Sequence, residues 1–313
     1  MTMSHLVPLI SVLVPTYRRP DMLARCLAKM RQALDRESHR FELLVGDNSD
    51  MPENRVIVEG FARNWGGHVD YMGHSGQRNM QDNWNDLARR ARGTYLQYVH
   101  DDDYLLPHAG ERLMSIARLY RFKPRLVKLG VRLVTVDERS LRVEGARHAR
   151  SIESGQAMRM LISRSSFVRF PSLLIPRTQL LDCGLFDREA KVQDWPTWLE
   201  LAKNHGIVER PELTAAYTVH EGAGTNQQFT PEYLNEIIGL LERHGTPYPD
   251  RCDLISRFLF RWILAGARRA WLARDIPALR SRLNMINLPE MRPYRCPPRW
   301  LPILLFLKSV AQK

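Results

Sequence analysis

Short apolar runs alternate with stretches of helical periodicity over the first hundred positions of the chain. Residues 9–14 form a nearly continuous apolar run, which is typical of a strand covered on both faces of a parallel sheet. Residues 21–30 repeat apolar side chains at helical spacing, and we expect Asp21 to cap this helix. The alternation continues, with strands predicted at residues 41–45, 68–71 and 95–99 and a helix at 79–92. This succession predicts βαβ units and a parallel sheet.

The pattern is less regular after residue 107. We predict helices at residues 110–120 and 179–186, a strand or strand pair at 125–136, and strands at 170–176 and 214–219. Residues 139–164 are polar and basic, which predicts a surface loop that contacts substrate or is mobile. The fold class is therefore α/β, with a mixed, mainly parallel sheet flanked by helices at residues 1–250. A helical extension is predicted at residues 251–313.

Charge is concentrated in that extension. The 313 residues carry a formal charge of +12, and residues 251–313 hold 13 Lys and Arg against three acidic residues. Residues 255–270 and 292–313 combine these basic residues with Trp and aliphatic side chains at helical spacing. Two interpretations stay open, a peripheral anchor on an anionic membrane surface and a helix pair packed on the protein with its basic side in water.

Cysteine usage and hydropathy bear on the compartment. The four cysteines, Cys26, Cys183, Cys252 and Cys296, are far apart, which indicates reduced thiols and argues against a structural zinc site. No apolar stretch reaches the length of a transmembrane helix. We expect a cytoplasmic protein, or one that is peripheral on the cytoplasmic face of the inner membrane.

An acidic cluster follows the predicted strand at residues 95–99. In open α/β sheets, ligands bind at the carboxyl ends of the strands, where Asp101, Asp102 and Asp103 would project. Three adjacent carboxylates repel one another unless solvent or a cation neutralises them. The cluster is therefore either a solvated turn or part of a site for a hard divalent metal.

Other polar residues follow predicted strands or begin helices. Thr16 and Arg18 follow the first strand, and Asp47 ends the second. Asp194 precedes a proline in the first turn of a predicted helix, so a helix-capping role is the alternative to chemistry there. His220 follows the strand at 214–219, and a lone histidine is either structural or a ligand.

Four motifs in order give a family resemblance. They are Val-Pro-Thr-Tyr-Arg at residues 14–18, Val-Gly-Asp-Asn-Ser at 45–49, Tyr-Val-His-Asp-Asp-Asp at 98–103 and Gln-Asp-Trp at 193–195. Over residues 8–225 the chain resembles glycosyltransferase family 2, whose members are inverting nucleotide-sugar transferases of the GT-A fold. The resemblance implies a nucleotide-binding half at about residues 1–107 and an acceptor half at about 108–250.

The resemblance also implies roles for individual residues. Asp194 would be the catalytic base, and Asp102, Asp103 and His220 would hold a divalent metal, Mn²⁺ or Mg²⁺. The nucleotide-sugar would be bound by Pro15, Thr16, Tyr17, Arg18, Asp47, Arg78 and Asp101. The chain departs from the family at Gly46 and His100, where Asp is usual, and at Gln193, where Glu is usual.

These features predict transfer of a sugar from a nucleoside-diphospho-sugar to a hydroxyl of a saccharide or polyprenyl-linked acceptor. Bacterial O-antigen or capsule synthesis is the expected context. One rival is a nucleotidyltransferase that makes the sugar nucleotide, but the loop at residues 15–20 lacks the glycines that such a phosphate loop needs. The other is a basic adaptor that binds a membrane or nucleic acid through its tail.

Overall fold

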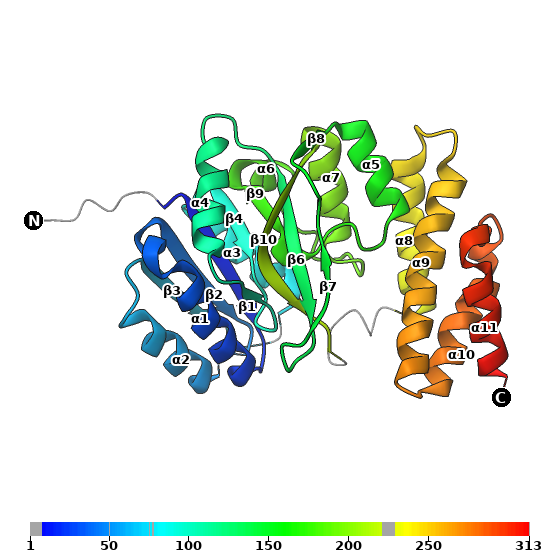
Figure 1. The fold of residues 1–313 in the computed structure, drawn as a ribbon, viewed down its shortest axis with the longest axis horizontal. Helices are drawn as coiled ribbons and strands as arrows, with labels where there is room; N and C mark the ends of the chain where they lie inside the picture. Colours follow the sequence, from blue (N-terminus) through cyan, green and yellow to red (C-terminus); the bar gives the residue numbers. More distant parts are fainter. Residues whose placement is uncertain (1–7, 50, 75, 77, 221–228, 313) are drawn as a thin grey trace, which may run out of the picture. The chain divides into compact units, whose positions relative to one another are not determined.

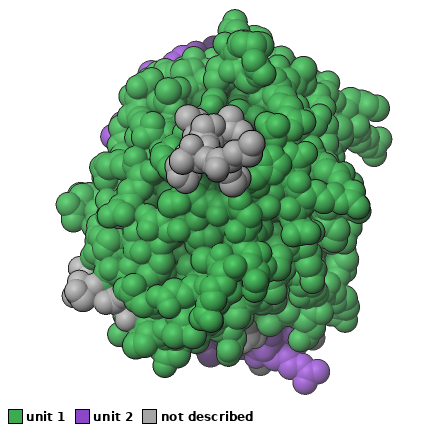
Figure 2. All heavy atoms as spheres, turned by 90° about the vertical axis from the view of Figure 1, so that its left-hand side faces the viewer, with its two compact units in different colours: residues 1–154, 168–220 green, residues 155–167, 221–313 purple. Residues whose placement is uncertain are grey.

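The computed structural model describes residues 8–49, 51–74, 76, 78–220 and 229–312. The chain divides into two compact units (Figure 2). Unit 1 comprises residues 1–154 and 168–220, and unit 2 comprises residues 155–167 and 221–313. The domain boundary predicted at residue 250 stays a prediction, because compactness alone does not delimit a catalytic domain.

The first part of unit 1 is the predicted parallel sheet (Figure 1). Its strands, in the spatial order β3-β2-β1-β4, are β3 (His68–Gly73), β2 (Phe41–Asp47), β1 (Ile10–Thr16) and β4 (Tyr95–Tyr98). All three pairings are parallel. The connecting helices are α1 (Pro20–Leu34), α2 (Pro52–Ala62) and α3 (Met80–Arg90), and we did not predict α2. The register pairs Thr16 with Asp47, so these two strand ends lie side by side.

The second part of the sheet continues beyond β4. Strand β9 (Leu173–Pro176) is antiparallel to both β4 and β6 (Val127–Val134), so β6 runs in the direction of β4. Strand β10 (Ile207–Thr218) is parallel to β6, and β5 (Tyr104–Leu105) is antiparallel to β10. The predicted mixed, mainly parallel sheet is therefore confirmed. Unit 1 also contains helices α4 (Ala109–Leu119), α6 (Arg177–Asp182) and α7 (Trp195–His205).

The prediction of a surface loop at residues 139–164 is wrong. This stretch contains strands β7 (Ser140–Glu144) and β8 (Arg150–Ile152) and helix α5 (Ser154–Ser163). β7 pairs only with β6 and β8 only with β10 among the described strands, and both are largely exposed. Exposed strands need no alternation of polar and apolar residues, so their sequence does not show the strand pattern.

Helix α1 buries the predicted apolar face but begins two residues earlier than expected. Leu23, Cys26, Leu27 and Met30 are all buried. The N-cap position is occupied by Arg19 and Pro20 is the first helical residue, so the expected cap at Asp21 is wrong. Proline is favoured at this position because its missing N–H would have no partner in the helix.

Unit 2 is helical. Besides α5, it contains α8 (Pro231–Gly245), α9 (Arg251–Leu272), α10 (Ile276–Asn284) and α11 (Leu301–Ala311). The guanidinium of Arg159 on α5 pairs with the carboxylate of Asp250, which precedes α9, through contacts of 2.7 and 2.5 Å. The helix predicted at residues 255–270 is confirmed within α9. Over the described residues, no helix combines the length and the apolar character that a membrane crossing needs.

Candidate active site

Asp101 joins the acidic loop to the end of β1. Its Oδ2 accepts a hydrogen bond from Thr16 Oγ1 at 2.7 Å and lies 3.4 Å from the backbone N of Tyr17. A guanidinium nitrogen of Arg19 lies 3.4 Å from Oδ1 of the same carboxylate. Burial and the charge of Asp102 raise the pKa of Asp101 to about 6. Because β1 and β4 are parallel neighbours, their carboxyl ends meet at one edge of the sheet, as the sequence predicted.

Asp102 pairs with two basic side chains. Its Oδ2 lies 2.9 Å from Nε2 of His220 and 3.0 Å from a guanidinium nitrogen of Arg19. Burial opposes ionisation of this carboxyl, but the hydrogen bond to His220 and the nearby positive charges lower its pKa below the ordinary value. The structure therefore brings together the ends of β1, β4 and β10.

Asp103 points to the backbone of β10. Its Oδ1 accepts a hydrogen bond from the N–H of Thr218 at 2.8 Å, and the residue is 1% exposed. Burial and the charge of Asp102 raise its pKa well above the ordinary value. This contact ties the acidic loop to the strand that carries His220.

The acidic loop and His220 offer few protein ligands for a divalent metal. Within the described ranges, no cluster of three or more His, Cys, Asp or Glu side chains is placed to hold a metal ion. The pair formed by Asp102 and His220 offers one carboxylate and one imidazole. Ions such as Mg²⁺ often take only one or two protein ligands and the rest from substrate phosphates and water. The pair fits an ion bound in that way and does not fit an all-protein cage.

Arg25 of α1 donates hydrogen bonds to the acidic loop and to two neighbouring segments, and we call this set of contacts the brace. The sequence did not predict it. One terminal nitrogen donates to the backbone oxygen of Asp102 at 2.5 Å and lies 3.4 Å from Thr218 Oγ1. The other donates to the backbone oxygen of Val136 at 3.1 Å. A single side chain thus holds the acidic loop, the end of β10 and the turn between β6 and β7.

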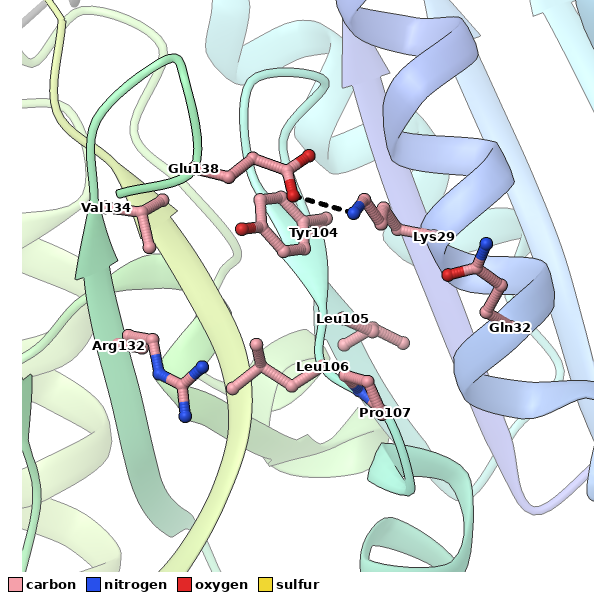
Figure 3. Close-up of a pocket in the computed structure, with 9 residues that line it drawn as sticks. All are labelled: Lys29, Gln32, Tyr104, Leu105, Leu106, Pro107, Arg132, Val134 and Glu138. Carbon is pink, nitrogen blue, oxygen red and sulfur yellow. Dashed lines mark hydrogen bonds and ion pairs between the residues drawn. The ribbon is translucent and has the colours of Figure 1, made fainter. Parts of the chain in front are cut away.

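A small cavity of about 180 Å³ lies next to this brace (Figure 3). The ion pair of Lys29 with Glu138, at 2.7 Å, lies above the ring of Tyr104, and Arg132 lines the wall formed by β6. None of the predicted site residues lines the cavity. It is therefore a gap behind the acidic loop and not the predicted donor site.

Asp47 is held by donors from the loop that follows it, from α2 and from β3. Its carboxylate accepts hydrogen bonds from the N–H of Ser49 at 2.8 Å, the amide of Asn54 at 2.9 Å and the hydroxyl of Tyr71 at 2.9 Å. Burial opposes ionisation, but these donors lower the pKa of Asp47 below its ordinary value. A direct contact with a base or ribose would require some of these bonds to be given up.

Gly46 is a departure from the family that the structure explains. The side-chain amide of Asn83 on α3 donates to the backbone oxygen of Gly46 at 2.8 Å. A Cβ at residue 46 would lie 2.0 Å from Oδ1 of Asn83. Asn83 therefore occupies the space that the usual Asp would need.

The remaining predicted donor-binding residues differ in accessibility. Pro15 is buried in β1, whereas the ring of Tyr17 is 53% exposed with the Arg18 guanidinium 5.1 Å from its centroid. Arg78 is paired with Asp86 of α3 at 2.5 Å. The described hydrogen bonds of Asp47, Arg78 and Asp194 go to residues other than Asp102 and His220.

Asp194 occupies the N-cap position of α7, but its side chain makes no capping hydrogen bond. Its Oδ2 instead accepts a hydrogen bond from the indole N–H of Trp198 at 2.7 Å. Burial raises the pKa of Asp194 to about 6, against the lowering effects of this hydrogen bond and of the charge of Arg169. The interpretation of Asp194 as only a helix cap therefore lacks the contact that defines it.

An aromatic cluster lies between the acidic loop and Asp194. Phe170 is at its centre, with ring centroids 4.6 Å from His100 and 5.1 Å from Trp198. The other members are Trp84, Tyr98 and Phe186. The cluster connects His100, which precedes Asp101, to the tryptophan that holds Asp194.

Comparison with known proteins agrees with this geometry. The model of Glycosyl transferase family 2 matches residues 11–138. The chain is 28% identical over 210 residues to the uncharacterized protein MT1568 of Mycobacterium tuberculosis, a match that covers 62% of each protein. It is 25% identical over 108 residues to an uncharacterized glycosyltransferase of Haemophilus influenzae, covering 34% of each. The matches thus span less than two thirds of either relative.

Two solved structures share the fold. A crystal structure of S. aureus TarS 1–349 with UDP-GlcNAc has a TM-score of 0.63 and 16% identity, covering 96% of this chain and 87% of that one. The mannosyltransferase PcManGT from Pyrobaculum calidifontis, in complex with GDP-Man and Mn²⁺, has a TM-score of 0.55 and 15% identity, covering 98% and 87%. The predicted GT-A fold is confirmed, and residues 11–138 resemble glycosyltransferase family 2, as the four motifs predicted.

Proposed function

We propose that this protein transfers a sugar from a nucleoside-diphospho-sugar to a hydroxyl of a saccharide or lipid-linked saccharide, with inversion at the anomeric carbon. The observation that carries the proposal is the meeting of Thr16, Asp101, Asp102 and His220 at the carboxyl edge of the sheet. The complexes of TarS with UDP-GlcNAc and of PcManGT with GDP-Man support a nucleotide-sugar donor.

The donor would bind beside the loop that follows β1. Pro15, Thr16, Tyr17 and Arg18 lie there, and the exposed ring of Tyr17 can stack on a base or sugar. Asp101 is fixed by Thr16 and can accept a hydrogen bond from the ribose. Arg78 remains a proposed donor contact. Asp47 contributes by holding the loop that ends β2, because its carboxylate already has several donors.

Departure of the nucleoside diphosphate builds negative charge on the leaving group. Asp102 and His220 would hold a divalent cation, Mn²⁺ or Mg²⁺, which neutralises phosphate charge when bound. The guanidinium of Arg19 adds a positive charge 3.0 Å from Asp102. Asp103, also predicted as a ligand, is given the role of fixing the loop to β10, because its described hydrogen bond goes to Thr218.

Asp194 would accept the proton of the acceptor hydroxyl as that hydroxyl attacks the sugar. A pKa of about 6 leaves this carboxyl ionised at neutral pH and a better proton acceptor than an exposed Asp. A single base and direct displacement from the face opposite the diphosphate give inversion, since no covalent intermediate forms on the protein.

The surface of unit 2 supports a proposal for the acceptor class. Helix α11 exposes Leu301, Ile303, Leu305 and Phe306, and the stretch from residue 292 to the end of the helix carries Arg292, Arg295, Arg299 and Lys308. Exposed apolar side chains beside basic ones favour an anionic lipid surface. We therefore place the protein at the cytoplasmic face of a membrane, with a polyprenyl-linked acceptor of O-antigen or capsule synthesis. Deletion of residues 292–313 should release it from anionic vesicles, and unchanged binding would refute this placement.

The decisive test is product release from a panel of UDP-, GDP- and dTDP-sugars with Mn²⁺ or Mg²⁺ and lipid-linked or oligosaccharide acceptors. We expect release of nucleoside diphosphate with one donor and its absence in the Asp194→Asn variant. Release of pyrophosphate from a nucleoside triphosphate and a sugar phosphate would support a nucleotidyltransferase instead. Salt-sensitive binding to DNA or vesicles, with no binding of nucleoside diphosphates, would support the adaptor.

A further inference from the structure

Asp194 makes an unusual hydrogen bond for its position. Asp at an N-cap normally accepts from a backbone N–H two or three residues later, because those donors have no partner within the helix. Here the backbone oxygen of Asp194 accepts from the N–H of Trp198, and its side chain accepts from the indole of the same residue. One residue, a helical turn away, thus takes the place of the cap.

The indole of Trp198 is itself immobilised. The residue is 2% exposed, and its ring meets Phe170 and Phe186 edge-on at 5.1 and 5.5 Å. Phe170 also lies 4.6 Å from the ring of His100, next to the acidic loop. A side chain packed in this way has one accessible rotamer, so its N–H points in a fixed direction.

We propose that Trp198 is a positioning residue, whose indole N–H orients the carboxylate of Asp194 for proton transfer from the acceptor hydroxyl. This inference rests on the proposed role of Asp194 as the base. The carboxylate keeps one oxygen on the indole and presents the other, Oδ1, for the incoming proton. The aromatic cluster then maintains the distance between the base and the acidic loop.

Two further polar groups face Asp194 from other elements. Arg169, just before β9, lies close enough for its charge to favour the ionised carboxyl, and Tyr217 of β10 interacts with both side chains. Arg169 is held by Glu144 at 3.1 Å and lies 4.9 Å from the centroid of the Tyr217 ring. These contacts of Arg169 do not involve Trp198, so we expect them to persist when Trp198 is changed and the effect of the indole N–H to be measurable separately.

The direction of the effect follows from the hydrogen bond. An N–H donated to a carboxylate stabilises the ionised form, so its loss raises the pKa of Asp194 further above its ordinary value. The acid limb of the pH–rate profile should then move to higher pH by about one unit, because a hydrogen bond to a charged group has about that effect. At a pH below the acid limbs of both the wild-type protein and the Trp198 variant, turnover of the variant should be about tenfold lower. The KM for the donor should stay unchanged.

The cluster offers a matched control. Trp84 is 1% exposed and packs against Phe170 and Phe186, but its indole nitrogen has no hydrogen-bond partner in the part of the chain that the structure describes. Trp198→Phe and Trp84→Phe remove the same atoms from the same cluster. Only Trp198→Phe should move the acid limb. An equal movement in both variants would overturn the proposal in favour of a packing effect.

Two measurements keep the test decisive. The pKa of Asp194 should be followed by NMR in the full chain with ¹³C-carboxyl-labelled aspartate, assigned with Asp194→Asn, because this readout does not need turnover. If Trp198→Phe does not fold, benzothienylalanine at residue 198 keeps the ring shape and removes only the N–H. An unchanged pKa overturns the role of Trp198. Absence of turnover together with a raised pKa would reject the proposed function and leave the effect of the indole on Asp194 supported.

Discussion

The imidazole Nε2 of His220 lies 2.9 Å from Oδ2 of Asp102, although the two residues are 118 positions apart. The pair forms because β10 ends beside the acidic loop that follows β4. Asp103 strengthens this placement through its bond to the N–H of Thr218, two residues before His220. The two side chains most suited to holding a cation are therefore brought together by the backbone of the sheet.

Replacing either member of this pair should weaken metal-dependent nucleotide binding. We expect Asp102→Ala and His220→Ala each to reduce the affinity for the nucleoside diphosphate at least about tenfold in the presence of Mn²⁺, because substrate phosphates need the cation. Binding without metal should be unchanged. Isothermal titration calorimetry with and without the metal measures both values, and equal losses in the two conditions would contradict a metal-holding role.

Asp103 should behave differently from Asp102. In Asp103→Asn the side-chain oxygen can still accept from Thr218, so metal-dependent binding should persist. In Asp103→Ala the buried N–H loses its acceptor, and the free energy of unfolding should fall by about 1–3 kcal/mol. Chemical denaturation and calorimetry on both variants make the comparison. Loss of metal-dependent binding in a folded Asp103→Asn variant would instead support the ligand role that the sequence predicted.

Turnover should depend on pH through Asp194. Burial raises its pKa to about 6, so the base is ionised above that pH and protonated below it. The rate of transfer should fall as the pH decreases through 6, and Asp194→Asn should lower kcat by about 10²–10⁴-fold without changing nucleotide affinity. A pH–rate profile and single-turnover kinetics measure these quantities. An Asn variant that keeps most of its turnover would remove Asp194 from the chemistry.

The brace formed by Arg25 gives a prediction with its own control. Arg25→Met removes donors to Asp102, Thr218 and Val136, so the metal concentration needed for half-maximal nucleotide binding should rise about tenfold. Lys29→Met, one turn along the same helix, removes the ion pair with Glu138 and a cation–π contact with Tyr104, which Arg25 also makes, and should leave that concentration unchanged. Similar changes in the two variants would show that the helix, and not the brace, is responsible.

The sequence predicted best where burial imposes a pattern. β1, β2 and β4 are covered on both faces, so their apolar runs were visible, and the motifs at their ends carried the resemblance to glycosyltransferase family 2. The exposed strand β7 had no such pattern and was mistaken for a loop. The bond from Trp198 to Asp194 has a helical spacing of four residues, which the sequence contains. The partners of Arg25 lie 77, 111 and 193 positions away, and no local pattern could indicate them.

The contact between Gly46 and Asn83 limits how an aspartate, the usual residue of glycosyltransferase family 2 at this position, can be introduced at residue 46. An aspartate introduced at 46 alone would collide with an amide that is fixed to the backbone of β2. Asn83 changed alone would remove that support and open a gap beside the strand. An acidic residue at position 46 therefore requires a simultaneous substitution of Asn83, whether it is introduced by engineering or arises in evolution.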